Sequence, residues 1–221
     1  MPNFQFGCKR MIISSDYYPS FERDNVNLET SGISKFTKSG IVTEAGIEHS
    51  LDAVILATGF DLGLASAPFK ITGANSRSLD AEWSTGAVAY KGVTISGYPN
   101  WFTIMGPNTG PGHTSVIIYT EAQINYIKQA IQLIIDNELK SVDVKPQIQI
   151  DYNEGLQNRM KHTVWTSGSC NSWYLNKDGS NCALYPGFAK EYTSRISKFD
   201  ALEYLLTPID KVTEEKRKSS A

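Results

Sequence analysis

The sequence predicts an α/β fold, and two stretches carry that prediction. The first is an apolar run over residues 101–105, followed by a turn over 106–113 and then by apolar residues that recur at helical spacing as far as residue 137. The second is the continuous apolar run over residues 53–57, which is typical of a parallel strand covered on both faces. Strand, turn and helix in this order indicate where a ligand would bind.

The turn at residues 106–113 reads Gly-Pro-Asn-Thr-Gly-Pro-Gly-His. Its glycines and prolines exclude regular structure and let the backbone approach a ligand closely. The first turn of the following helix presents unpaired N–H groups and the positive end of the helix dipole, which suit an anion. The candidate binding residues are Gly106, Pro107, Asn108, Gly112, His113 and Thr114. Two alternatives stay open: the turn is only a connection, and His113 stabilises the helix start instead of acting in acid–base chemistry.

The helix after the turn is predicted to bury one face. Isoleucines recur along it at helical spacing, with polar residues between them. The residues expected on this buried face are Ile117, Ile124, Ile127, Ile131 and Ile134.

The first sixty residues are predicted to contain a β-meander. Short strands are expected over residues 33–36, 41–43 and 47–49, with glycines between them. The apolar run over 53–57 ends at Thr58 and Gly59, where the edge of a sheet commonly offers backbone to a ligand. Lys9 and Arg10 are adjacent cations, which on sequence alone form a solvated surface pair.

The remaining segments are expected to connect and complete these elements. Residues 61–97 are rich in glycine, serine, alanine and asparagine, which indicates a connection between domains. Helices are expected over about 151–165 and 189–205, with a loop between them over 167–174. The charged segment near the end of the chain is expected to fray.

Composition and charge exclude several classes of function. The chain has 221 residues, of which 41% are hydrophobic, so it can form a core. Its net charge of −2 does not provide the excess of positive charge that nucleic-acid binding requires. No apolar run approaches the roughly 20 residues of a transmembrane helix, and no signal-peptide core follows Met1, so a cytoplasmic location is expected. The spacing of the three cysteines and three histidines matches neither a metal site nor a redox dithiol, and we expect reduced structural thiols.

Seven short motifs follow one another along the chain. They are Gly-Cys-Lys-Arg at 7–10, Tyr-Tyr-Pro at 17–19, Asn-Val-Asn-Leu at 25–28, Leu-Asp-Ala-Val-Ile-Leu-Ala-Thr-Gly-Phe at 51–60, Tyr-Pro-Asn-Trp-Phe at 98–102, the turn at 106–113, and Asn-Ser-Trp-Tyr at 171–174. In this order they resemble the C-terminal half of class B flavin-dependent monooxygenases, most of all the Baeyer–Villiger type, including members like 4-hydroxyacetophenone monooxygenase. The resemblance covers residue 7 to about residue 199.

The resemblance implies an incomplete Rossmann-like fold with FAD and NADPH as cofactors, because the family binds FAD in one such domain and NADPH in a second domain inserted into it. Residues 1–60 would be the C-terminal part of the NADPH-binding domain, and 61–97 the interdomain connection. Residues 98–205 would be the C-terminal part of the FAD-binding domain with a mobile loop, and 206–221 the charged tail.

The resemblance also implies roles for single residues. Arg10 matches the active-site arginine, which lies over the flavin and stabilises negatively charged oxygen intermediates. Lys9 matches a lysine that contacts the NADPH 2′-phosphate, and Thr58 and Gly59 match a hinge strand between the domains. The glycine-rich turn would face the pyrimidine end of the isoalloxazine. Trp173 matches a mobile-loop tryptophan that closes over the nicotinamide, although a loop tryptophan often only anchors packing.

The chain departs from the family in one respect: it contains neither of the two G-x-G-x-x-G fingerprints that hold the cofactor pyrophosphates. We therefore expect a fragment, which is a truncated gene product, half of a split enzyme whose partner is a complementary N-terminal polypeptide, or part of a longer gene. With its N-terminal half it would oxidise a ketone, or a soft nitrogen or sulfur atom, with O2. The alternative is a non-catalytic remnant that binds another polypeptide. A disulfide-reductase type of flavoprotein is disfavoured because no redox cysteine pair is present.

Overall fold

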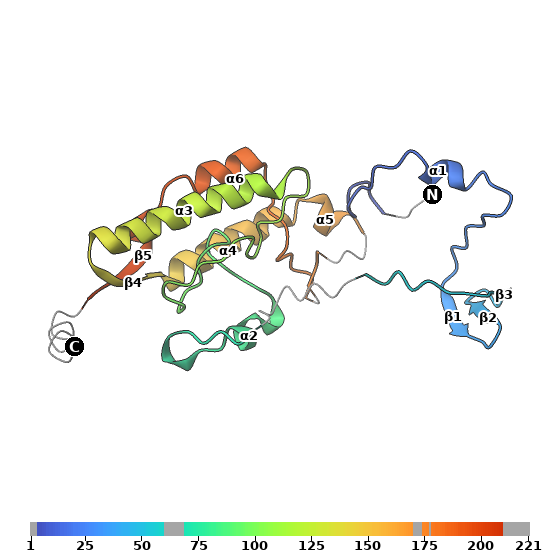
Figure 1. The fold of residues 1–221 in the computed structure, drawn as a ribbon, viewed down its shortest axis with the longest axis horizontal. Helices are drawn as coiled ribbons and strands as arrows, with labels where there is room; N and C mark the ends of the chain where they lie inside the picture. The colour runs from blue at the N-terminus through green and yellow to red at the C-terminus, as the bar shows by residue number, and fades with distance from the viewer. Residues whose placement is uncertain (1–3, 60–68, 170–173, 177, 210–221) are drawn as a thin grey trace, which may run out of the picture. The chain divides into compact units, whose positions relative to one another are not determined.

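The computed structural model describes residues 4–59, 69–169, 174–176 and 178–209. The chain divides into two compact units, Met11–Leu62 on one side and Met1–Arg10 with Gly63–Ala221 on the other. Figure 1 labels the helices and strands of both units. The domain boundaries expected from the resemblance stay a prediction. Trp173 and most of the charged tail lie outside the described residues.

The smaller unit contains the β-meander that the sequence predicts. Strands β1 (Ile33–Phe36), β2 (Gly40–Thr43) and β3 (Glu48–Ser50) form an antiparallel sheet in the order β1-β2-β3, after a short helix α1 (Tyr17–Ser20). The expected parallel strand at residues 53–57 is not present. In this part of the chain the segment belongs to no strand and is exposed.

The larger unit is built around helix α3 (Val116–Asp136), as predicted, and a two-stranded antiparallel sheet of β4 (Leu139–Val144) and β5 (Tyr204–Pro208). Helices α4 (Pro146–Met160), α5 (Val164–Ser167) and α6 (Ala189–Arg195) and a 3-10 turn η3 (Ala201–Glu203) complete it. In Figure 1, α6 lies alongside α3. The helix expected over 189–205 therefore ends at Arg195 and is followed by a strand.

The core between these elements is rich in tyrosine. Its fully buried side chains include Tyr119 and Tyr126 of α3, Tyr192 of α6, and Tyr185. Tyr119 and Tyr192 stack with ring centroids 4.5 Å apart. Because phenol rings combine a large apolar surface with a hydroxyl that needs a partner, they can hold a polar network inside this core.

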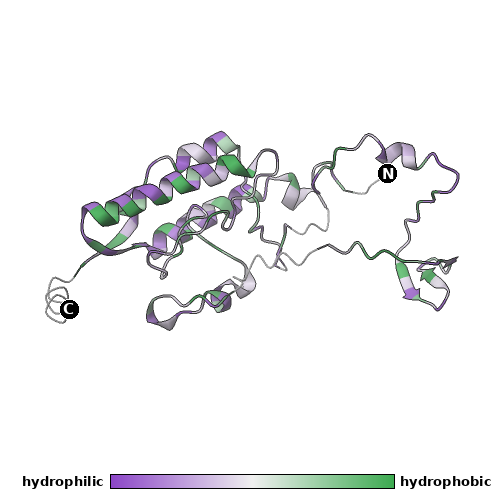
Figure 2. Cartoon of the chain, in the orientation of Figure 1, coloured by the Kyte–Doolittle hydropathy of each residue, from purple (hydrophilic) through white to green (hydrophobic). Residues whose placement is uncertain are grey.

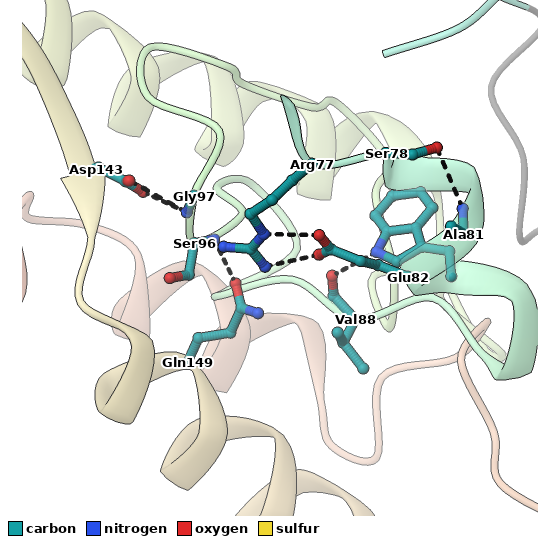
Figure 3. A network of polar contacts seen from close by, with 10 residues as sticks. Arg77, Ser78, Ala81, Glu82, Val88, Ser96, Gly97, Asp143 and Gln149 are labelled. Atoms are coloured by element: carbon teal, nitrogen blue, oxygen red, sulfur yellow. Dashed lines mark hydrogen bonds and ion pairs between the residues drawn. The ribbon is translucent and has the colours of Figure 1, made fainter. Parts of the chain in front are cut away.

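Residues 69–98 pack as a second cluster with little regular structure. The cluster contains the 3-10 turns η1 (Ala74–Ser76) and η2 (Trp83–Thr85) and the short helix α2 (Leu79–Glu82). Figure 3 shows its polar contacts: the Arg77 guanidinium donates two hydrogen bonds of 2.7 Å to the Glu82 carboxylate, and Asp143 of β4 accepts from the backbone N–H of Gly97. The segment predicted as a connection is therefore fixed against β4.

The expectations for a membrane-spanning helix, a metal site and the cysteines can be compared with the structure. No helix among the described residues is long and apolar enough to cross a membrane, and those residues contain no cluster of His, Cys, Asp and Glu that could hold a metal ion. Cys182 is free and buried, as predicted. Cys8 is disulfide-bonded, so the prediction of a reduced thiol is wrong for this residue.

Candidate active site

The segment that carries Lys9 and Arg10 is held against helix α5. The backbone N–H of Gln5 donates to the carbonyl of Gly168, 3.0 Å away, and Cys8 is fully buried. A Cβ atom added at Gly168 would lie 2.9 Å from the Cβ of Cys8 and would clash with the Val164 carbonyl, so only glycine fits this contact. The Gly-Cys pair before the two cations therefore anchors them to α5.

Lys9 and Arg10 themselves are exposed. The Lys9 ammonium lies 5.0 Å from the centre of the Phe4 ring, a cation–π distance. Arg10 lies close enough to Tyr174 that its charge lowers the pKa of that phenol, although burial of Tyr174 dominates and leaves its pKa raised. The two cations are thus available to a ligand, with Arg10 beside a buried tyrosine.

The glycine-rich turn is held rigidly by the rest of the larger unit. Asn108 is buried, and its amide group donates to the backbone carbonyls of Asn181 and Leu184. The backbone N–H of Gly110 donates to the carbonyl of Ala183 at 2.8 Å, and Gly110 carbonyl accepts from Tyr185 N–H at 3.0 Å. The turn is pinned on one side to residues 181–185.

The glycines of the turn are explained by contacts within the chain. A Cβ at Gly106 would clash with the Gly92 carbonyl, and one at Gly112 would enter the ring of Trp165. A Cβ at Gly110 would lie 2.7 Å from the Ala183 carbonyl. These glycines thus serve close packing inside the chain, and contact of the buried Pro107 and Asn108 with a cofactor stays a prediction.

The turn and the cation pair meet the same short helix. Trp165 of α5 packs against Gly112, whereas Val164 and the Gly168 that follows α5 face the segment of Gly7 and Cys8. Sequence analysis missed Trp165, which lies at the end of a polar stretch and carries no motif. Helix α5 therefore links the predicted catalytic arginine to the predicted flavin-facing turn.

The start of α3 is open, as an anion site requires. Residues 112–118 are exposed, and the N-cap Ser115 hydroxyl accepts a 3.2 Å hydrogen bond from the Ile117 N–H. The His113 ring contacts Phe188 edge to face at 5.7 Å and has an exposed side chain. The exposed residues at the positive end of this 21-residue helix leave its start accessible to an anion.

Two of the remaining predicted site residues belong to the smaller unit. Thr58 and Gly59 are exposed and belong to the smaller unit, with Gly59 in the left-handed region at a φ of +80°. Their predicted hinge role is untested. Trp173 lies outside the described residues.

Sequence analysis also missed a buried network of hydrogen bonds that begins at the residue before the turn. The fully buried Gln123 of α3 accepts from the Met105 backbone N–H at 2.9 Å and donates to the Tyr192 hydroxyl at 2.8 Å. That hydroxyl donates to the Lys91 carbonyl at 2.9 Å. The Lys91 ammonium is nearly buried and pairs with Glu203 at 2.9 Å. The signal in the sequence was Gln123 itself, a polar residue at helical spacing from Tyr119 and Tyr126.

Curated relatives match the chain along almost its whole length. A Baeyer–Villiger monooxygenase from Pseudomonas aeruginosa is 40% identical over 222 residues, which cover 99% of this chain and 42% of the relative. One from Streptomyces coelicolor is 37% identical, covering 92% of this chain and 39% of the relative. No family model matches. The chain thus spans about two fifths of the length of these relatives.

Solved structures give the same result. An oxidised steroid monooxygenase bound to NADP has a TM-score of 0.77 and 28% identity over 94% of this chain and 40% of that one. A closed cyclohexanone monooxygenase has a TM-score of 0.70 and 24% identity, which shows the fold alone. These matches support a fragment that is similar to Baeyer–Villiger monooxygenases and has a mixed α/β fold, and they are consistent with a C-terminal portion, as the motifs predicted.

Proposed function

We propose that this fragment of the Baeyer–Villiger monooxygenase type supplies the C-terminal portion of an FAD- and NADPH-dependent monooxygenase. The whole enzyme would insert one oxygen atom from O2 into a ketone, or oxidise a soft nitrogen or sulfur atom. The observation that carries this proposal is the 40% identity along 99% of the chain, combined with an exposed Arg10 linked through α5 to the glycine-rich turn. The compartment proposed is the cytoplasm.

The residues present fit parts of both cofactors. The exposed start of α3 would hold the anionic edge of the flavin, and the exposed Lys9 would bind the NADPH 2′-phosphate. FAD, reduced by NADPH, supplies the reaction with O2. Arg10 would donate hydrogen bonds to the negative charge that develops on oxygen.

The proposal requires a complementary portion of the fold. About three fifths of the length of these relatives is not matched by this chain, and the chain itself has no G-x-G-x-x-G fingerprint for either pyrophosphate. We propose that this N-terminal portion, on the same or a separate polypeptide, brings the dinucleotide-binding strands.

The test is reconstitution with the N-terminal portion of the Pseudomonas aeruginosa relative that precedes the matched region. The mixture is incubated with FAD, desalted, and examined for a visible flavin band, for flavin reduction by NADPH and for oxygenated product. We expect a flavin band for the mixture and none for the chain alone. A mixture that stays colourless would contradict the proposal.

Arg10→Ala should abolish product formation in the reconstituted enzyme while leaving flavin reduction by NADPH largely intact. The reason is that the lost guanidinium stabilises charge on oxygen and not hydride transfer. Arg23→Ala removes another exposed arginine and serves as the control, with both rates unchanged. Normal product formation by Arg10→Ala would remove this residue from the mechanism.

Lys9→Ala should raise the KM for NADPH and weaken the preference for NADPH over NADH. Removing the point charge that faces the 2′-phosphate affects NADPH alone. Steady-state kinetics with both nucleotides check this. If the preference is unaltered, Lys9 is only a surface cation.

A second candidate function is a non-catalytic remnant that binds another polypeptide. The observation in its favour is the large number of exposed isoleucines on α3. Product formation by the reconstituted enzyme would exclude it.

A further inference from the structure

Helix α3 is apolar on two sides, and only one of them is covered by the larger unit. The covered side consists of Tyr119, Gln123, Tyr126 and Ala130, all buried. The other side consists of Ile117, Ile124 and Ile131, spaced seven residues apart and exposed by 58%, 50% and 46%. We call these three residues the isoleucine face.

The isoleucine face is separate from the solvent-exposed polar side of α3. Glu121, Asn125, Lys128 and Gln132 are exposed and follow one another at spacings of four, three and four residues, which places them in one narrow polar strip. The alternation of green and purple along α3 in Figure 2 shows both kinds of side chain. A helix with apolar sides on both flanks of a narrow polar strip is typical of a helix enclosed between two layers.

The surface beside the isoleucine face is hollowed. An open groove of about 330 Å³ lies there. Its lining residues are Ile104, Ile124, Ile127, Lys128, Ile131 and Gln132. Ile104 precedes the glycine-rich turn, so the groove joins α3 to the segment that leads into the candidate active site. An apolar groove of this kind fits side chains of another protein segment.

We propose that the isoleucine face and its groove are the docking surface for the N-terminal portion of the monooxygenase fold. This inference rests on the proposed function for the identity of that portion. The relatives match this chain from end to end, yet extend over more than twice its length, so a large folded portion is available to cover the face. Docking there would also fix the start of α3 and the turn against the complementary portion.

The experiment measures binding of the full chain to the N-terminal portion of the Pseudomonas aeruginosa relative by sedimentation, together with hydrogen exchange of α3. The variant Ile124→Asp with Ile131→Asp puts two charges on the isoleucine face. The matched control, Asn125→Asp with Asn158→Asp, puts the same two charges on exposed positions that do not line the groove. All four positions are exposed, so both variants should keep the far-UV circular dichroism of the parent chain.

We expect the N-terminal portion to bind the parent chain and to slow exchange over residues 117–131. The isoleucine-face variant should bind about 100-fold more weakly, because charging the centre of an apolar interface removes its main anchors, whereas the control should bind within about threefold of the parent. Absence of binding, unchanged exchange in α3, or equal affinity of both variants would each overturn the inference. The inference would also be overturned if the chain alone formed a homodimer and the isoleucine-face variant were monomeric.

The flavin band and product formation are measured on the same complex. A complex that docks through the isoleucine face but forms no product would support this inference and contradict the proposed function. If both variants bind the N-terminal portion with equal affinity and the complexes form product, the proposed function is supported and this inference is contradicted.

Discussion

Gln123 is predicted to be the side chain that holds the glycine-rich turn in place. Its amide oxygen accepts from the Met105 N–H, and its amide nitrogen donates to the Tyr192 hydroxyl, so one side chain joins α3, the start of the turn and α6. The variant Gln123→Leu keeps nearly the same volume and removes both hydrogen bonds. It therefore tests the polar contacts without opening a large cavity.

The expected loss follows from the groups left behind. The Met105 N–H loses its side-chain acceptor, and because this hydrogen bond is only partly buried the loss costs about 1 kcal/mol. The Tyr192 hydroxyl loses an accepted bond but still donates to the Lys91 carbonyl, which adds about 0.5–1 kcal/mol. We expect Gln123→Leu to lower the free energy of unfolding by about 1.5–2 kcal/mol, a substantial share of a typical domain's stability.

The assay is urea unfolding of the full chain followed by near-UV circular dichroism of its tyrosines, with amide hydrogen exchange at Met105. Gln132→Leu is the control, because Gln132 is exposed and bonds only within α3, to Asp136. The control should change stability by less than about 0.5 kcal/mol. Equal stability of Gln123→Leu and the parent, or unchanged exchange at Met105, would refute the reasoning.

Two further predictions concern the surroundings of the turn. Asn108 has a φ of +56°, in the left-handed region. Asn108→Ala should therefore be about 1 kcal/mol less stable than Asn108→Gly in urea unfolding, because both variants lose the amide but only alanine is strained there. Equal stabilities of the two variants would show that strain is absent. The pKa of Glu191 is lowered from its ordinary value of 4.5. Its largest cause is the pair of hydrogen bonds from Arg159; burial acts in the opposite direction, and a hydrogen bond with Tyr185 lowers the pKa further. The stability from this group is therefore present above pH 4.5 and is lost as the pH falls towards its folded-state pKa. Glu191→Gln should flatten that part of the pH–stability curve, and a curve parallel to that of the parent would contradict the assignment.

Local patterns predicted some elements well because the short-range signal was sufficient. The strands of the β-meander lie where glycines and alternating residues placed them, and α3 follows the turn as expected. The helix expected over about 151–165 lies at Pro146–Met160, so the alternating glutamine and isoleucine residues at 147–150 belong to it. Pro146 suits the start of this helix, because it occupies the first turn of α4, where its missing N–H costs nothing. Residues 101–105 form no strand, and Phe102 makes only a single bridge to Thr94.

The candidate site was predicted in part. The sequence placed the turn between an apolar segment and a helix and suggested that its glycines make room for a ligand, but it could not say what approaches them. The structure shows that Gly106 and Gly112 make room for the Gly92 carbonyl and the Trp165 ring. Both contacts join residues distant in sequence or in different elements, and no local pattern encodes them.

Burial is where the sequence and the structure disagree most, and the disagreement has one physical reading. The sequence predicts burial for the isoleucines of α3 and for residues 53–57, yet Ile124 is 50% exposed and Ile55 is 92% exposed. The exposed isoleucines lie beside a different, tyrosine-lined face of α3 that the chain does cover. An apolar pattern records every layer against which an element packs in the complete fold, whereas the structure of this chain shows only the layers that the chain itself contains. Under the proposed docking, the exposed isoleucines of α3 are the residues that the complementary portion would cover.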